Sequence, residues 1–422
     1  MDKSIQPIGM SRADARVPGS KSYTHRMLIC ASLAGGESVV RRGLVSQDTL
    51  LTIEGLQRMG ATIRREDKDY FVTGTGGRLA PCAEPIDLHN SGTSMRLLTA
   101  VAALGTGIYT LTGSRRMQER PIGHLVDALA MLGVPVRALS PKSCPPVEVQ
   151  GGHISGSAVD IDCSVSSQYL SGLLLIAPLT EKGMEINVLK GPVSRPYLDM
   201  TLDVMERFGA TLERDGYTRF SVPGGQAYSP GEYQVDADAS AASYFFGAAA
   251  ITKTAIRVRG TRLDSVQGDI RLCGVLERMG CAVRQTEDGV EVTGGPLKAA
   301  TVDMGDIPDM VPTLAVVAAF AEGTTIIENV AHLRAKESDR LGCVVQELTE
   351  MGVRAHCTED RLLIQGGRPH GAAITTHDDH RLAMAFAMAG LVVPHMVIKD
   401  AGCVEKSFPN FWEEFEKLYG ED

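Results

Sequence analysis

The sequence predicts an α/β protein of two similar domains, each built from three βαβαββ-type units with buried parallel helices and outer sheets. Three observations support this prediction. A helix-ending glycine motif recurs at intervals of about 70 residues along the chain of 422 residues. A second helix, apolar nearly all round, precedes each copy of the motif, with a β-rich run between the two. Glycine is also enriched: 45 of the 422 residues are glycine, about 11%, against about 7% in an average protein.

The recurring motif is an amphipathic segment that ends in a glycine, and five of its six copies run on into a β-rich segment. The glycines are Gly60, Gly133, Gly209, Gly280, Gly352 and Gly420. A glycine in this place is typical of a helix C-terminus, where the chain adopts a left-handed conformation. We therefore expect these six glycines to have a structural role only.

The apolar helix of each unit begins with polar residues. The equivalent starting positions are Ser22, Ser91, Ser167, Ala239, Asp309 and Asp379. Because these helices are apolar on nearly every side, we expect them to be buried. The second helices carry more charge and should be more exposed.

The sixth unit is truncated, because only two residues follow Gly420. Residues 1–17 contain two β-like runs with no helix before them, and we expect both runs to supply the strands that the sixth unit lacks. The predicted domains are therefore 18–237, and 1–17 together with 238–422. The chain would cross between them near Pro18 and near Asp238.

The composition excludes several classes of function. The net charge of −9 and the 5% aromatic content make a nucleic acid a poor partner. Nine scattered cysteines without a C-x-x-C pair predict reduced thiols and a cytoplasmic location. The N-terminus lacks a signal peptide, and the apolar stretches are too short to span a bilayer, so no membrane association is expected.

Cationic side chains gather at the predicted helix starts. Lys21 and Arg26 lie at the first buried helix, and Arg381 lies at the last. Ser, Asn and Asp at such positions are ordinary N-caps, but capping does not require cations, which are unfavourable at a positive helix end unless an anion binds there. The pattern therefore predicts a small anionic ligand.

Basic segments also precede the second helices. Pro121 and Pro196 are expected at the first helical position. The segment 334–340 is expected to open a helix with Lys336 and Arg340 on one face; a solvated charge run is the alternative interpretation. The spacing of His377 and His380 would suit a metal ion, but no matching ligand motif accompanies it, and no metal site is predicted.

Ten motifs in order from residue 18 to 409 carry a family resemblance. They are PGSKSYTHR, NSGTSMR, QERPIGHL, SSQYLSG, SRPY, DASAASY, IPDM, LRAKESDR, DDHR and KSFP. Together they resemble the 5-enolpyruvylshikimate-3-phosphate synthases (3-phosphoshikimate 1-carboxyvinyltransferases) over essentially the whole chain. The resemblance implies two domains of three units whose helix N-termini face an interdomain cleft.

The resemblance also implies an activity. Members of the family transfer the enolpyruvyl group of phosphoenolpyruvate to the 5-hydroxyl of shikimate 3-phosphate and release phosphate, by addition and elimination through a tetrahedral intermediate. No metal or organic cofactor is expected. The implied partners are these two small molecules, with neither nucleic acid nor membrane, and the protein is expected to be a monomer. The domain 18–237 would bind mainly shikimate 3-phosphate, and the other would contribute catalytic and phosphoenolpyruvate-binding residues.

The resemblance assigns site residues to three overlapping groups. The catalytic group is Asp309, Glu337, Lys21 and Lys336. The shikimate 3-phosphate group is Lys21, Ser22, Arg26, Ser166, Ser167, Gln168, Ser194, Tyr197, Asp309 and Lys336. The phosphoenolpyruvate group is Lys21, Gly92, Arg120, Gln168, Arg340, Arg381 and Lys406. Asp309 resembles the base near the shikimate hydroxyls, and several Arg and Lys side chains suit two substrates rich in carboxylate and phosphate.

The chain departs from the family pattern at a few positions. Ser91 and Ser94 stand where alanines are common and Leu97 where a proline is common, so the sequence makes no prediction about the response to glyphosate, which competes at that site. His332 stands where some members have Asn, and no binding role is assigned to it.

Two alternative functions are less consistent with the sequence. A UDP-N-acetylglucosamine enolpyruvyl transferase would have a reactive Cys in the loop 116–121, where this chain has none. A six-repeat DNA clamp would need basic helices facing a channel, whereas the first helices are apolar.

Overall fold

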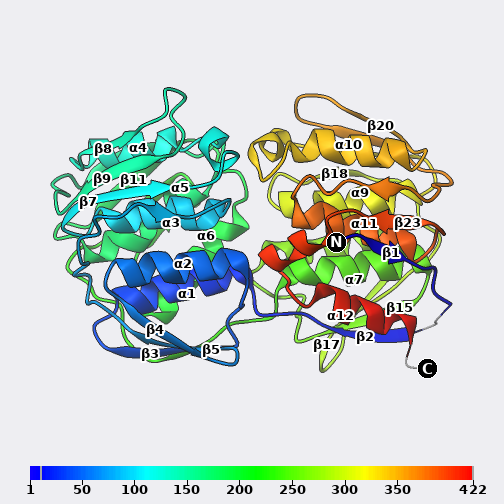
Figure 1. Cartoon of the computed structure of the whole chain (residues 1–422), viewed down its shortest axis with the longest axis horizontal. Coiled ribbons are helices and arrows are strands. Elements are labelled where there is room, and N and C mark those ends of the chain that lie inside the picture. The colour runs from blue at the N-terminus through cyan, green and yellow to red at the C-terminus, as the bar shows by residue number, and fades with distance from the viewer. Residues whose placement is uncertain (10–11, 421–422) are drawn as a thin grey trace. The chain divides into compact units, whose positions relative to one another are not determined.

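The computed structural model describes residues 1–9 and 12–420, and these divide into two compact units. Unit 1 consists of Met1–Ser20 and Asp236–Asp422, and unit 2 of Lys21–Val235. Within the described residues, five sheets have four strands and one has three. The predicted fold class, α/β repeats with buried helices and outer sheets, is confirmed (Figure 1).

The predicted buried helices are present, one in each repeat. They are α1 (Lys21–Leu33), α3 (Gly92–Ala102), α5 (Gln168–Ile176), α7 (Ala239–Thr252), α9 (Val311–Ala319) and α11 (His380–Gly390). Nearly every residue of these helices is buried, as their sequences predict. Each unit thus has its own core, with three of these helices in it.

The second helices bury one face only. They are α2 (Gln47–Arg58), α4 (Gly123–Met131), α6 (Pro196–Arg207), α8 (Leu272–Arg278), α10 (Arg340–Glu350) and α12 (Phe411–Glu416). The six motif glycines at or just beyond their ends all have positive φ, from 75° at Gly352 to 113° at Gly280. The predicted helix-end role of these glycines is therefore confirmed.

The strands of unit 2 form three sheets. Their bounds are β3 (Glu37–Arg41), β4 (Thr62–Glu66), β5 (Asp69–Thr73), β6 (Ile86–Asp87), β7 (Gly107–Thr112), β8 (Val136–Ala138), β9 (Val147–Gly151), β10 (Ala158–Asp162), β11 (Met184–Lys190), β12 (Glu213–Asp215), β13 (Arg219–Val222) and β14 (Glu232–Gln234). The orders are β14-β3-β5-β4, β6-β7-β9-β8 and β10-β11-β13-β12. In each sheet the first two strands are parallel and the last two form an antiparallel hairpin.

Two sheets of unit 1 repeat this plan, and its third sheet has three strands. Its strands are β1 (Lys3–Ile5), β2 (Arg12–Arg16), β15 (Ala255–Arg259), β16 (Ala282–Gln285), β17 (Gly289–Thr293), β18 (Thr301–Asp303), β19 (Thr324–Glu328), β20 (Arg354–Cys357), β21 (Leu362–Gln365), β22 (Ala373–Ile374) and β23 (Met396–Ile398). The orders are β2-β15-β17-β16, β18-β19-β21-β20 and β22-β23-β1.

The N-terminal strands differ from the expectation. β1 pairs antiparallel with β23 and so completes the sheet of the sixth repeat, as expected. β2 does not join it: β2 pairs parallel with β15 in the sheet of the fourth repeat. β14, which precedes α7, similarly pairs with β3 in the sheet of the first repeat. The strand before the first helix of each unit thus lies in a sheet of the other unit. Such long-range pairing is not revealed by any local sequence pattern.

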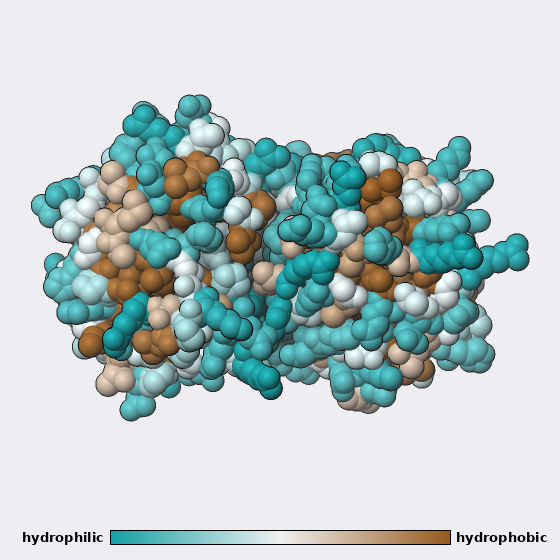
Figure 2. All heavy atoms as spheres, turned by 90° about the horizontal axis from the view of Figure 1, so that it is seen from above, coloured by the Kyte–Doolittle hydropathy of each residue, from teal (hydrophilic) through white to brown (hydrophobic). Residues whose placement is uncertain are grey.

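Exposed large apolar side chains occur singly on different elements. Examples are Leu50 on α2, Ile108 on β7 and Leu189 on β11. The face shown in Figure 2 is mainly hydrophilic, with hydrophobic residues in scattered groups. This is ordinary for a folded surface. Among the described residues, no helix is long and apolar enough to cross a bilayer.

A pair of glycine substitutions is expected to have opposite effects on stability. Gly352 has a φ of +75°, and an added Cβ would lie 2.7 Å from His370 Nε2. Gly352→Ala should therefore lower the free energy of unfolding by about 1–2 kcal/mol. Gly274 lies within α8, and its Cβ would meet nothing within 4 Å. Gly274→Ala should raise the same quantity by about 0.5–1 kcal/mol. Urea unfolding of both variants measures the two signs, and equal signs would contradict the helix-end assignment.

Candidate active site

The helix starts of unit 2 bring several predicted residues together. Gln168 is the first residue of α5, and its Nε2 donates to Thr93 Oγ1 of α3 at 3.0 Å. Arg26 of α1 donates to the carbonyl oxygens of Ser22 (3.0 Å) and Tyr197 (3.1 Å), which lie at the starts of α1 and α6. The start of α5 is thus linked to that of α3, and α1 to the start of α6. We call these four helix starts the unit 2 cluster.

Arg26 is a buried cation held by neutral oxygens. Its side chain is fully buried, and it also donates to the hydroxyls of Thr201 (2.7 Å) and Ser171 (3.4 Å). Burial lowers the pKa of Arg26 to about 10, which still leaves the side chain charged at neutral pH. A buried guanidinium whose hydrogen bonds go to hydroxyls and carbonyls favours an anion nearby.

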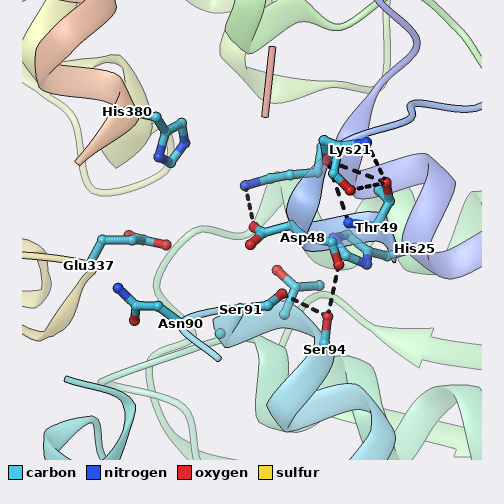
Figure 3. Close-up of polar contacts among 12 residues, drawn as sticks. Lys21, His25, Asp48, Thr49, Asn90, Ser91, Ser94, Glu337 and His380 are labelled. Atoms are coloured by element: carbon cyan, nitrogen blue, oxygen red, sulfur yellow. Dashed lines mark hydrogen bonds and ion pairs between the residues drawn. The ribbon is translucent and has the colours of Figure 1, made fainter. Parts of the chain in front are cut away.

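Lys21, the first residue of α1, pairs with a carboxylate that no sequence motif marks. Its Nζ lies 3.1 Å from Asp48 Oδ2 (Figure 3). Asp48 is buried in the first turn of α2, which Ser46 caps. An acid in a first helical turn is a common stabilising feature, so only the tertiary contact with Lys21 marks Asp48 as part of the cluster.

Two buried arginines surround Gly92 at the start of α3. A Cβ on Gly92 would lie 2.5 Å from Arg120 Nη2 and 2.5 Å from Arg96 Nη1. Arg120 also donates to the Asn90 carbonyl at 3.1 Å, and Arg96 to the Gly92 carbonyl at 3.1 Å. Two guanidinium groups at a helix N-terminus concentrate positive charge there, and any side chain at position 92 would require both groups to shift.

The serines predicted at the third helix start lie around the first turn of α5. The backbone N–H of Gln168 donates to Ser166 Oγ at 3.2 Å. The Ser167 hydroxyl donates to the Ser194 carbonyl at 3.4 Å, and Ser194 itself has a φ of +56°. These contacts tie the loop before α6 to the start of α5.

Unit 1 places three cations around Asp309. Arg381 Nη2 lies 2.7 Å from Oδ2 of Asp309, Arg340 Nη1 lies 2.9 Å from Oδ1, and Lys336 Nζ lies 3.9 Å from Oδ1. Burial opposes the ionised form of Asp309, but Arg381, Lys336 and Arg340 outweigh it and hold the pKa of the carboxyl well below its usual range. Asp309 is therefore a carboxylate at neutral pH. Asp309 with its cations is called the unit 1 cluster.

Arg340 is the centre of that cluster. Its side chain is 1% exposed, and it donates from Nε to Asp379 Oδ2 at 2.9 Å and from Nη2 to Glu337 Oε2 at 2.9 Å. Burial opposes the charge on Arg340, but Asp379, Glu337 and Asp309 raise its pKa further above the ordinary value. Asp379 caps α11 and accepts from the backbone N–H of Arg381, so the same carboxylate fixes both arginines.

Two local expectations were wrong. Lys336 and Arg340 do not share a helix face, because Lys336 has an extended backbone after the 3₁₀ helix η5 (Ala331–Ala335) and α10 begins only at Arg340. Their side chains meet at Asp309 through the tertiary fold. Pro121 is not a first helical residue, since α4 begins at Gly123, whereas Pro196 does begin α6.

The remaining predicted residue of unit 1, Lys406, is 8% exposed and lies in the 3₁₀ helix η6 (Ala401–Lys406), which packs against α11. Asp269 was not predicted. It is buried and accepts a hydrogen bond from Ser240, in the first turn of α7, and burial together with Asp309 raises its pKa to about 6. Asp269 lies in the 3₁₀ helix η3 (Gly268–Arg271), 29 positions after Ser240, and no local signal marks it.

The histidines of unit 1 have separate surroundings. His377 Nε2 lies 2.8 Å from Glu347 Oε1, a buried carboxylate of α10 that also accepts from the Thr375 N–H. Across residues 1–9 and 12–420, the structure contains no group of three or more His, Cys, Asp or Glu side chains arranged to hold a metal ion.

His332, in η5, is a buried histidine whose Nε2 has no hydrogen-bond partner in the described part of the chain. Burial, together with the charge of Lys336, lowers the pKa of His332 to about 3. The imidazole is therefore neutral in the folded protein at physiological pH.

Replacing His332 with asparagine is expected to make the protein less sensitive to acid. The unfolded histidine takes up a proton near pH 6.5, whereas the folded one does not until about pH 3. The wild type therefore loses stability as the pH falls below 6.5, by about 2 kcal/mol between pH 7 and pH 5. Urea unfolding of both proteins at these two pH values measures the difference, and an identical pH dependence would show that His332 titrates normally.

Comparisons with known proteins find a matching family model and relatives of nearly the same length. The family model described as EPSP synthase (3-phosphoshikimate 1-carboxyvinyltransferase) matches residues 5–415. A 3-phosphoshikimate 1-carboxyvinyltransferase from Methanosphaerula palustris is 46% identical over 98% of this chain and 98% of its own length. One from Syntrophobacter fumaroxidans is 45% identical over 99% of this chain and 100% of its own.

Solved structures give the same result. An EPSP synthase from Acinetobacter baumannii has a TM-score of 0.82 at 27% identity, covering 99% of this chain and 98% of that one. The enolpyruvyl transferase NikO from Streptomyces tendae, at 20% identity and a TM-score of 0.77, covers 99% of this chain and 97% of its own and shares the fold. The chain therefore belongs to the EPSP synthase (3-phosphoshikimate 1-carboxyvinyltransferase) family.

Proposed function

We propose that this protein transfers the enolpyruvyl group of phosphoenolpyruvate to the 5-hydroxyl of shikimate 3-phosphate and releases phosphate, a step of the shikimate pathway of aromatic amino-acid biosynthesis. The observation that carries this proposal is the near-complete match, at 40–46% identity, to relatives that bear the name of this activity. A UDP-N-acetylglucosamine enolpyruvyl transferase and a DNA clamp are not favoured by these relatives.

The two clusters offer the charge that such substrates need. Phosphoenolpyruvate and shikimate 3-phosphate carry phosphate and carboxylate groups, and arginines bind both in a bidentate manner. We assign the shikimate 3-phosphate role to the predicted helix-start residues of the unit 2 cluster, with Asp309 and Lys336. We assign phosphoenolpyruvate to its predicted group, in which Arg340 and Arg381 are buried.

The reaction needs an acid and a base. The methylene carbon of phosphoenolpyruvate gains a proton while the 5-hydroxyl loses one and attacks the adjacent carbon, and the tetrahedral intermediate then loses a methyl proton and phosphate. We propose Asp309 as the base for the hydroxyl, and Lys21, Lys336 and Glu337 as the groups that move the other protons.

The electrostatics of Asp309 fit this role. Arg381, Lys336 and Arg340 depress its pKa, which makes it a weak base while those cations act on it alone. Substrate anions that take part of the positive charge of Arg340 and Arg381 would raise the pKa of Asp309 toward the range of an effective base. Substrate binding and activation of the base are coupled in this account.

Phosphate release tests the proposal. The purified protein should release phosphate only when phosphoenolpyruvate and shikimate 3-phosphate are both present, at a rate that saturates with each. Replacing shikimate 3-phosphate with UDP-N-acetylglucosamine should abolish release. Release with the UDP-sugar and none with shikimate 3-phosphate would overturn the assignment.

We also infer that the protein acts in the cytoplasm as a monomer. The nine cysteines, all within the described residues, are free thiols, which suits a reducing compartment. Light scattering at assay concentration tests the monomer, and a dimer mass would contradict it.

A further inference from the structure

The N-cap residue of α3 does not cap its helix. Ser91 occupies the N-cap position, yet its side chain makes no capping hydrogen bond. Its Oγ instead lies 2.7 Å from Ser94 Oγ (Figure 3). A serine at this position ordinarily accepts a hydrogen bond from an amide of the first turn. The hydroxyl of Ser91 therefore bonds to a side chain and not to the amides that it would normally satisfy.

A buried chain of hydrogen bonds holds Ser94 in this place. Ser94 Oγ lies 2.7 Å from Thr52 Oγ1 of α2, and Thr52 Oγ1 lies 2.7 Å from His25 Nδ1 of α1. All of these side chains are fully buried. The chain thus runs from α1 through α2 to the first turn of α3, entirely within unit 2.

One arrangement of the protons satisfies every contact in the chain. His25 Nδ1–H donates to Thr52, the Thr52 hydroxyl donates to Ser94, and the Ser94 hydroxyl donates to the Asp48 carbonyl at 3.3 Å. Ser94 Oγ then accepts a second hydrogen bond, from the Ser91 hydroxyl. The Asp48 carboxylate bonds to Lys21, so the chain also joins α3 to the lysine of the unit 2 cluster.

The start of α3 is also where Gly92 lies between the buried guanidinium groups of Arg96 and Arg120. The first-turn amides of a helix have no partner within the helix. Because the Ser91 hydroxyl does not bond to them, these amides and the two guanidinium groups together suit an anion at this helix start.

We propose that His25, Thr52 and Ser94 are positioning residues, which hold the Ser91 hydroxyl off the α3 N-terminus and so reserve its amides for an anionic group of phosphoenolpyruvate. This inference rests on the proposed function. It assigns no contact with substrate to the three residues; they act through Ser91 alone. If the chain is broken, the Ser91 hydroxyl becomes a competitor of the substrate for the same amides.

The test compares a single variant, which should impair binding of phosphoenolpyruvate, with a double variant, which should restore it. Ser94→Ala removes the partner of the Ser91 hydroxyl, which then caps α3. The KM for phosphoenolpyruvate should rise about fivefold, because a serine cap worth about 1 kcal/mol would compete with the substrate for the amides. The kcat should change by less than about twofold. The double variant Ser91→Ala with Ser94→Ala leaves no hydroxyl to cap, and its KM should return to within about twofold of the wild type. Thr52→Val, which breaks the chain outside α3, should raise the KM as well.

Thr99→Ala is the matched control. Thr99 is a buried residue of α3 whose hydroxyl donates to the Met95 carbonyl; its loss should leave the KM for phosphoenolpyruvate unchanged. A KM unchanged in Ser94→Ala, or a double variant as impaired as the single one, would overturn the proposal, because a merely structural role predicts no rescue. Turnover by the wild type tests the proposed function separately, because its absence would refute that function. The KM values of active variants relative to the wild type test only this inference.

Discussion

Replacing Asp309 with asparagine is expected to lower kcat by about 100-fold or more. Arg340, Arg381 and Lys336 all converge on this carboxylate, and asparagine keeps its shape but cannot accept a proton. Steady-state phosphate release with both substrates measures the effect. The KM values should change much less than kcat, because the amide still fills the same space.

The control for Asp309→Asn is the same substitution at Asp264. Asp264 pairs with Arg262 at the surface, where both side chains are about 70% exposed, and Asp264→Asn should leave kcat unchanged. The melting temperature of each variant shows whether a loss of kcat comes from the chemical step or from unfolding. Near-normal turnover of a folded Asp309→Asn protein would remove Asp309 from the role of base.

Replacing Arg340 with lysine is expected to lower the free energy of unfolding by about 3–5 kcal/mol and to reduce kcat/KM for phosphoenolpyruvate by more than about 100-fold. One guanidinium serves three buried or nearly buried carboxylates, those of Asp309, Glu337 and Asp379. A lysine ammonium is a compact charge without the planar fork. It cannot reach all three carboxylates, and the ones left without a cation are costly to bury.

Arg334→Lys is the matched change for Arg340→Lys. Arg334 lies in the same segment and pairs with Asp339 at 3.0 Å, but its side chain is 38% exposed. Its replacement should alter the free energy of unfolding by less than about 1 kcal/mol. Urea unfolding compares the two variants. Equal stabilities would mean that Lys336 and Arg381 alone suffice to neutralise the three acids.

The repeat could be predicted from the sequence because its signals are local. A left-handed residue at a helix end requires glycine at that position whatever surrounds it, and Gly133 and Gly209 have φ of 84° and 85°, as the motif predicts. Burial of the six apolar helices follows in the same way from their composition. The family motifs at the helix starts could be recognised for the same reason, because each motif spans only a few consecutive positions.

The partners of those residues were not predictable. Lys21 meets Asp48, Arg340 meets Asp379 and Ser94 meets Thr52, each across about 25 to 45 positions of sequence, and no periodicity links such pairs. Even Lys336 and Arg340, four positions apart, were assigned to one helix face, whereas Lys336 is itself extended and the helix begins only at Arg340.

The sequence by itself therefore determined the number of repeats, the helix ends and the identity of the cations at the helix starts, because backbone conformation and hydrophobic periodicity depend on neighbours along the chain. The tertiary structure alone decided which sheet receives β2, which carboxylate holds each cation and where the Ser91 hydroxyl points. These depend on distances between segments remote in sequence, and a hydrogen bond or an ion pair is sensitive to differences of less than 1 Å.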